Sequence, residues 1–170
     1  DQQNKYIEYT SDPKKPIPSQ DGIFTNRTRE YMIADQRFAA NRPDVMVFET
    51  EVLTQDLTMV GPIQADLYVS MTGTDADFIV KVIDVYPDTS SAISPLNTET
   101  VMQNYQMLVR GEILRGKFRN SFSLPEPFKP NEINNVKVNL PDVAHTFKKG
   151  HKIMVQVQHS WFPLADRNPN

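Results

Sequence analysis

The sequence predicts an all-β domain of about eight strands, arranged as a jelly-roll sandwich of two antiparallel sheets. Short apolar runs recur along the chain, and several alternate apolar with polar residues, the period of a strand with one buried face. Polar or proline-containing turns separate the runs, and 13 prolines against six glycines indicate rigid connections. No segment has the spacing of a long helix. A length of 170 residues suits one such domain.

The strongest strand pattern lies in residues 61–88. Residues 63–72 have apolar side chains at alternate positions, which predicts a strand with one buried face. Residues 78–86 are apolar on both faces apart from Lys81 and Asp84, so we expect a strand that is covered on both sides. Because only a short polar segment joins these two runs, we expect them to pair as the central hairpin of the domain.

The other elements follow in chain order. Residues 1–21 are polar and proline-punctuated and are typical of an extended connector, whereas residues 26–40 are the only place where a short helix is plausible. Further strands are expected at 45–50, 57–60, 105–114 with a bulge at Arg110-Gly111, 117–122, 136–140, 143–147 and 152–162. Turns are expected at 141–142 and 148–150, and residues 89–98 indicate an exposed excursion.

The composition argues against several classes of partner. With 18 basic and 21 acidic residues and a net charge of −3, the chain gives no reason to expect binding to nucleic acid or to an anionic membrane. No apolar stretch approaches the length of a membrane span, and no signal peptide stands at Asp1. The absence of cysteine excludes a disulfide framework and a thiolate metal site, and is compatible with a secreted or a cytoplasmic protein.

No nucleophilic hydrolase site is predicted. None of the six glycines frames a serine as Gly-x-Ser-x-Gly. His159 and Ser160 are adjacent, but neighbours on a strand point to opposite faces and cannot form a base–nucleophile pair. We therefore assign no catalytic residue and expect His159 to face the core.

The histidines do not have metal-site spacing. They lie six and eight residues apart, at His145, His151 and His159, so no His-x-His pair falls on one strand face. His145 shares a strand face with apolar neighbours, so we expect its imidazole to be partly buried and hydrogen-bonded. His151 follows Gly150 at a turn and is expected to be solvated.

Two charged motifs also have ordinary interpretations. Asp75 and Asp77 begin like a calcium loop, but no ligating side chain continues the pattern, and tight turns favour the same residues. We expect no metal and no cofactor. A basic cluster contains Arg110, Arg115, Lys117 and Arg119. Because Glu112 lies within it, a solvated strand face or a protein interface is favoured over nucleic-acid binding.

The C-terminal segment HSWFPLADRNPN contains Trp161, Phe162, Asp166 and Arg167. Three interpretations are open. The aromatic residues could form a platform for sugar, as in a stand-alone carbohydrate-binding sandwich, or contact a neighbouring domain, or close the core.

Long segments of the chain closely resemble the C-terminal domain of the CocE/NonD hydrolases, the group of cocaine esterase, X-Pro dipeptidyl-peptidase and α-amino-acid ester hydrolase. They are VFETEVL (47–53), GPIQADLYVSMTGTDADFIVKVIDVYPD (61–88), LVRGEILRGKFRNSF (108–122), PEPFKPNE (125–132) and HTFKKGHKIMVQVQHSWFPLADRNPN (145–170). The resemblance implies a galactose-binding-domain-like jelly roll at 22–170, with residues 1–21 as the connector from an upstream α/β-hydrolase domain. The family pattern continues past residue 170, so we expect a domain truncated at its C-terminus, with an exposed sheet edge.

The resemblance also implies a function. In the family the Ser-His-Asp triad belongs to the α/β domain, and no triad position falls within this chain. We expect an accessory domain that packs on the catalytic domain of the same polypeptide and shapes access to the active site of a serine hydrolase for ester or amide bonds. Contacts between the domains are expected at Trp161, Phe162, Asp166 and Arg167. A homo-oligomer remains open, and the family slightly favours a secreted or periplasmic location.

Overall fold

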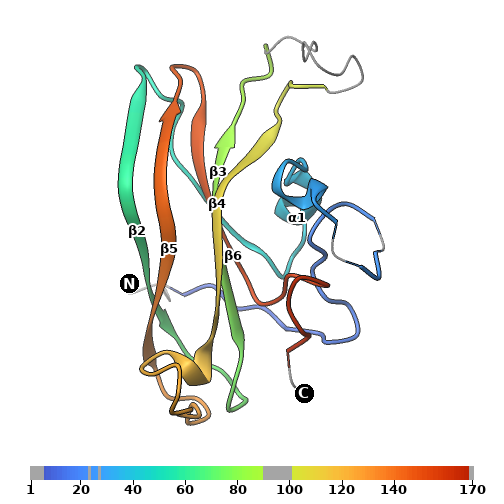
Figure 1. Ribbon diagram of the computed structural model, residues 1–170, viewed down its shortest axis with the longest axis vertical. Coiled ribbons are helices and arrows are strands. Elements are labelled where there is room, and N and C mark those ends of the chain that lie inside the picture. The colour runs from blue at the N-terminus through green and yellow to red at the C-terminus, as the bar shows by residue number, and fades with distance from the viewer. Residues whose placement is uncertain (1–5, 23, 27, 90–100, 169–170) are drawn as a thin grey trace, which may run out of the picture.

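A computed structural model of the chain describes residues 6–22, 24–26, 28–89 and 101–168. In this part of the chain the strands are β1 (Met46–Glu49), β2 (Leu57–Val69), β3 (Asp77–Val85), β4 (Gln106–Arg115), β5 (Asn134–Phe147) and β6 (Lys152–Gln158). One antiparallel sheet has the order β1-β6-β3-β4, and the other consists of β2 and β5. Figure 1 shows the β2–β5 layer beside the four-stranded layer. The predicted all-β sandwich is confirmed, although the described residues form six strands rather than about eight.

The main core lies between the two sheets. Val136 and Val138 of β5 are fully buried, and they face a row of residues from β3, namely Phe78, Val80 and Val82. The inward residues of β2 alternate with exposed ones, as the period of two predicts. β3 is buried on both faces along almost its whole length, also as predicted.

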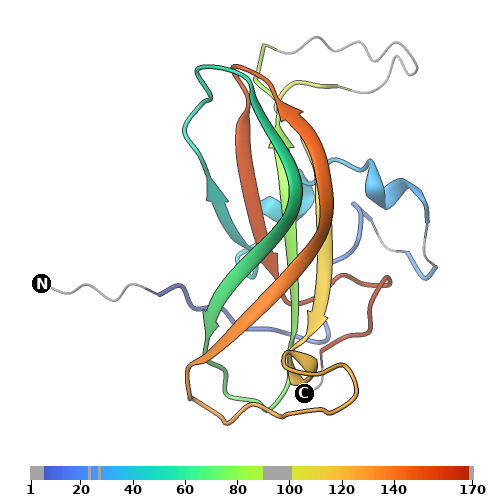
Figure 2. The ribbon, with the colours of Figure 1, turned by 60° about the vertical axis from the view of Figure 1, so that its left-hand side comes forward.

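The predicted central hairpin is wrong, because β2 and β3 lie in different sheets. β2 pairs with β5, whereas β3 lies between β4 and β6. Residues 70–76 cross from one layer to the other, so the apolar faces of the two strands meet across the core instead of lying side by side. Figure 2 shows β2 and β5 together in front of the other sheet. The alternation of apolar and polar residues identifies the buried face of a strand, but it does not identify the strand with which it pairs.

β2 and β5 are each longer than predicted. The runs 57–60 and 63–72 belong to the single strand β2, and the turn expected at 141–142 lies inside β5. The pairing is irregular between Gly61 and Ile63, opposite Leu140 and Val143, and Gly61 has a φ of 107°. Prolines cannot donate to a ladder, so a bulge at this point lets both strands continue through Pro62 and Pro141.

Other elements also differ in their bounds from the prediction. Residues 117–122 do not form a strand, because a 3₁₀ turn, η2 (Gly116–Phe118), follows β4 directly. β4 has a bulge one residue before the expected position: Val82 pairs with Arg110 and Ile83 with Leu108, so Val109 is the extra residue. The last strand ends at Gln158 rather than at 162. The excursion expected at 89–98 falls, from residue 90 onward, outside the described residues.

A third layer covers the outer face of the four-stranded sheet. It includes residues 28–41, termed the cover segment here, which contain η1 (Glu30–Met32) and α1 (Arg37–Ala40) in the region where a short helix was predicted. Figure 1 shows α1 on the opposite side of the sheet from β2 and β5. Ile17, Ala39 and Val45 form a small second core in this layer. Within the described residues, no helix is long and apolar enough to cross a membrane.

Candidate functional site

β3 carries two charged side chains within an otherwise apolar sequence, and each organises a buried polar cluster. Lys81 lies under the cover segment, and Asp84 lies on the other face of β3, toward β5. The two residues are 0% and 2% exposed. Burying a charge without a partner is costly, so side chains this deep mark a structural constraint or a functional site.

The Asp84 carboxylate lies between two imidazoles. Its Oδ2 is 2.9 Å from Nε2 of His145, and its Oδ1 is 2.7 Å from Nδ1 of His151. His145 also packs edge-on against Phe147, in agreement with the predicted satisfied imidazole. The prediction that His151 is solvated is wrong, because the turn at Gly150 brings its ring onto Asp84 and against Tyr86. The carboxylate thus ties together β3, β5 and the start of β6.

This cluster does not have the arrangement of a metal centre. Each carboxylate oxygen of Asp84 is already within hydrogen-bond distance of an imidazole nitrogen. In the described part of the chain, no three His, Cys, Asp or Glu side chains are placed to hold a metal ion.

Lys81 lies in an aromatic and amide enclosure. Its Nζ donates to Oε1 of Gln36 at 2.9 Å and lies 4.9 Å from the ring centroid of Trp161. Gly111 makes room for this indole, since a Cβ there would lie 3.1 Å from the Trp161 ring. Burial lowers the pKa of the Lys81 amine to about 7.

His159 and Ser160 do not form a nucleophile pair. The His159 ring stacks on Tyr9 with centroids 5.4 Å apart, and its Nε2 lies 3.9 Å from Oδ2 of Asp44. Burial lowers the pKa of His159, and burial together with the Asp44 carboxylate raises the pKa of Tyr9 to about 12. The Ser160 hydroxyl is buried and has no hydrogen-bond partner among the described residues. The expected buried histidine is confirmed.

The two charged motifs pair with each other or with their surroundings. Asp77 receives two hydrogen bonds from the Arg115 guanidinium, at 2.7 and 2.8 Å, and Asp75 lies 3.2 Å from Nζ of Lys117. Arg119 pairs with Glu126, and Arg110 donates to the backbone carbonyl of Asp142. These side chains therefore fasten loops and strands of the domain itself, while Arg115 and Lys117 stay 29% and 35% exposed. A protein interface on this face stays a prediction.

The predicted interdomain residues lie in a segment that is tied to the N-terminal region. Trp161 is only 7% exposed, so its ring cannot serve as the open platform that a sugar-binding module would need. Phe162 exchanges backbone hydrogen bonds with Ile17 and Ser19, and the Arg167 guanidinium lies over the Phe162 ring. Asp166 is exposed. Contact of this segment with another domain stays a prediction.

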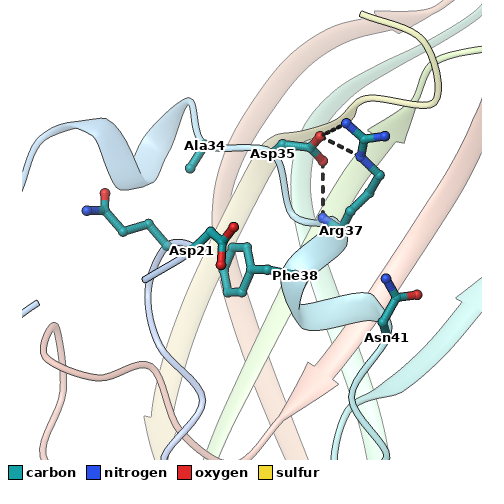
Figure 3. Close-up of a pocket in the computed structure, with 7 residues that line it drawn as sticks. Asp21, Ala34, Asp35, Arg37, Phe38 and Asn41 are labelled. Carbon is teal, nitrogen blue, oxygen red and sulfur yellow. Dashed lines mark hydrogen bonds and ion pairs between the residues drawn. The ribbon is translucent and has the colours of Figure 1, made fainter. Parts of the chain in front are cut away.

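A hollow of about 390 Å³ lies beside the cover segment. Its lining consists of Gln20, Asp21, Ala34, Asp35, Arg37, Phe38 and Asn41. Figure 3 shows Asp35 and Arg37 paired at its rim, where the guanidinium Nε donates to the carboxylate at 2.6 Å. The hollow is therefore lined by an ion pair, an aromatic ring and the exposed carboxylate of Asp21, and its lining contains no serine, histidine or lysine.

Sequence reasoning missed the roles of three residues. Lys81 and Asp84 had a visible signal, because they are the only charges in a run of residues that is apolar on both faces. Gln36 had none, because nothing local indicates that its amide lies over a buried lysine.

Residues 18–170 match the family model described as the X-Pro dipeptidyl-peptidase C-terminal non-catalytic domain. Cocaine esterase of Rhodococcus sp. (strain MB1 Bresler) is 36% identical over 95% of this chain and 26% of its own length.

Two solved structures are also similar. An aminopeptidase from a marine sediment archaeon, Thaumarchaeota archaeon, shares 42% identity with a TM-score of 0.81, over 94% of this chain and 26% of that protein. An α-amino acid ester hydrolase shares 38% identity with a TM-score of 0.82, over 94% of this chain and 25% of that protein. The chain thus spans about a quarter of the length of these relatives. It belongs to the family of X-Pro dipeptidyl-peptidase C-terminal non-catalytic domains, the non-catalytic C-terminal domain of hydrolases of the CocE/NonD type.

Proposed function

We propose that this chain is the accessory domain of a larger serine hydrolase and packs on an upstream α/β-hydrolase domain of the same polypeptide. Membership in a non-catalytic domain family carries the proposal. It is supported by the share of the relatives that the chain covers, about a quarter of each, which leaves most of each relative outside this domain. In this reading residues 1–21 are the connector and residues 22–170 the β-sandwich.

The domain contributes shape rather than chemistry. The relatives named above are an esterase, an aminopeptidase and an amino acid ester hydrolase, so the proposed substrates have an ester or amide bond next to an amino-acid-like group. A nucleophilic serine of the upstream domain would form the acyl-enzyme. The sandwich would narrow the approach to that serine and so select among substrates of different bulk.

The segment from Phe162 to Arg167 is the proposed contact with the upstream domain. The backbone N–H of Ala165 donates to the carbonyl of the buried Trp161, and the Arg167 guanidinium lies over Phe162 while its neighbour Asp166 is exposed. Arginine and aromatic residues are enriched where protein surfaces meet.

The test compares the longer natural polypeptide with a form that lacks this domain. Removal should change kcat/KM for a bulky X-Pro anilide more than for a small p-nitrophenyl ester, because only the bulky substrate meets the narrowed entrance. In the intact polypeptide, Asp166→Ala with Arg167→Ala should shift the same ratio, whereas Lys137→Ala on the exposed face of β5 should not. If the ratio of the kcat/KM values for the two substrates is the same in all forms, the proposal is contradicted.

A form without the domain that fails to fold still leaves a decisive measurement. Hydrogen exchange of residues 161–168 should be slower in the longer polypeptide than in the 170-residue chain. Equal exchange in the two settings would show that this segment is not the contact.

A further inference from the structure

Lys81 is enclosed from every direction. Within the four-stranded sheet its register partners are Gly111 of β4 and Gln156 of β6. Above the sheet lie Gln36 and the Phe38 ring of the cover segment, together with the indole of Trp161. The side chain has no exposed surface. An ammonium has three N–H donors, and the described residues offer this one a single acceptor, Oε1 of Gln36.

The surrounding elements supply no counter-charge. The charged groups on them are directed elsewhere: Asp35 is paired with Arg37, Asp77 with Arg115, Asp84 with two histidines, Arg110 with a carbonyl of β5, Glu112 with the amide of Ile113, and Lys152 with Glu49, while Arg29 and Glu30 of the cover segment are exposed. The facing residue of β6 is the neutral Gln156, and the cover segment adds the ring of Tyr31, which packs against Trp161. No described carboxylate forms a salt bridge with Lys81. Attraction to the indole face compensates a positive charge only in part.

The cover segment is attached to the sheet at few points. The backbone N–H of Gln36 donates to the carbonyl of Gln106 at 3.0 Å, and Oδ1 of Asp35 accepts from the N–H of Gln106 at 3.2 Å. The Tyr105 hydroxyl donates to the carbonyl of Ile33. The bond between Lys81 and Gln36 is a further polar attachment. A segment without a continuous ladder to its neighbours can open separately from the strands beneath it.

We propose that Lys81 is a proton-operated latch, in which protonation places an unpaired ammonium beneath residues 28–41 and releases this segment from the sheet. With Lys81 neutral, Gln36, Phe38 and Trp161 pack over an uncharged amine. With Lys81 protonated, water must reach the ammonium, and opening of the cover segment is the shortest route. Opening of the cover segment also removes part of the lining of the hollow beside α1, because Phe38 and Asp35 belong to the cover segment and line the hollow. This inference does not depend on the function proposed above.

Hydrogen exchange of the whole 170-residue chain between about pH 6 and about pH 9 tests the latch. Protection factors remove the intrinsic effect of pH on exchange. Because the amine has a pKa of about 7 when covered and the ordinary lysine value of about 10.4 when open, protection of residues 28–41 should fall about tenfold per pH unit from about pH 9 and level off below about pH 7. Lys81→Met should remove this dependence, and Lys137→Met on exposed β5 should retain it.

Two outcomes would overturn the proposal. One is the same pH dependence in wild type and Lys81→Met. The other is protection of residues 28–41 as high as that of β3 amides, since the segment would then open only when the whole domain unfolds. Should Lys81→Met fail to fold, ¹³C NMR of the lysine ε-carbons in the wild type decides. One resonance should titrate near pH 7, and titration of every lysine above about pH 10 would refute the latch.

Discussion

Asp84 shows how one side chain can connect three elements. It is 2% exposed, and each of its oxygens lies within hydrogen-bond distance of a different imidazole. The histidines come from β5 and from the turn before β6, so the carboxylate links two chain segments that do not pair with each other. The same neighbourhood places aromatic rings against both imidazoles.

Replacing Asp84 with Asn should therefore destabilise the domain substantially. The amide keeps the shape of the side chain but is uncharged and has one acceptor oxygen, so at most one imidazole N–H keeps its acceptor. We expect the free energy of unfolding in urea to fall by about 2–3 kcal/mol. Asp142→Asn is the matched control, because this carboxylate is exposed, and it should change stability by less than about 0.5 kcal/mol. Equal losses in the two variants would contradict the linking role of Asp84.

His159 should make stability fall in mild acid. Burial lowers its pKa below the ordinary value of 6.5, so the unfolded chain takes up a proton more readily than the folded one. The resulting contribution is complete above pH 6.5 and is lost as pH falls through 6.5 toward the lower folded pKa. Subtracting the stability–pH curve of His159→Gln from that of the wild type isolates this contribution. A flat difference between pH 7 and pH 5 would show that His159 is not responsible.

At the scale of elements, the turn after β4 depends on a close backbone approach. A Cβ at Gly116 would lie 2.4 Å from Cε2 of Phe128 and 2.9 Å from the carbonyl oxygen of Ala76. We expect Gly116→Ala to reduce the free energy of unfolding by about 2 kcal/mol, because the backbone oxygen cannot move freely. Gly73→Ala is the control, since no atom lies within 4 Å of its Cβ position. Thermal unfolding of the two variants side by side measures the effect. If Gly116→Ala is as stable as the wild type, the close backbone approach at this position is contradicted.

The sequence allowed the strands to be predicted better than their partners. Alternation located β2, and doubly apolar character located β3, because both patterns reflect which faces are buried. The hairpin between them failed because residues 70–76 can return along the same sheet or cross to the other, and local pattern does not distinguish these routes. Pro141 suggested a turn, but a bulge opposite Gly61 lets β5 continue through it.

For the polar clusters too, the sequence indicated the residues but not their partners. The run of residues that forms β3 revealed two charges that had to be accommodated, Lys81 and Asp84. Their hydrogen-bond partners come from positions up to 67 residues away in sequence, as between Asp84 and His151. Such long-range pairing depends on the sheet order, so the solvated His151 expected from its turn could not be corrected before the topology was known.

At the scale of the whole molecule, contacts within the domain hold its layers together. Its two sheets enclose the core, the cover segment shields the outer face of the larger sheet, and most of its charged motifs pair within the domain. No described serine lies within hydrogen-bond distance of a histidine. This agrees with a non-catalytic domain that spans about a quarter of each relative.

The most direct test assays the 170-residue chain beside the longer polypeptide proposed above. Both receive a p-nitrophenyl ester, an X-Pro anilide and a covalent probe for active-site serines. The longer polypeptide should turn over substrate and take up the probe, while the 170-residue chain should do neither. Turnover by the 170-residue chain that survives repurification and disappears in Ser160→Ala would contradict the account, because it would place a nucleophile inside this domain.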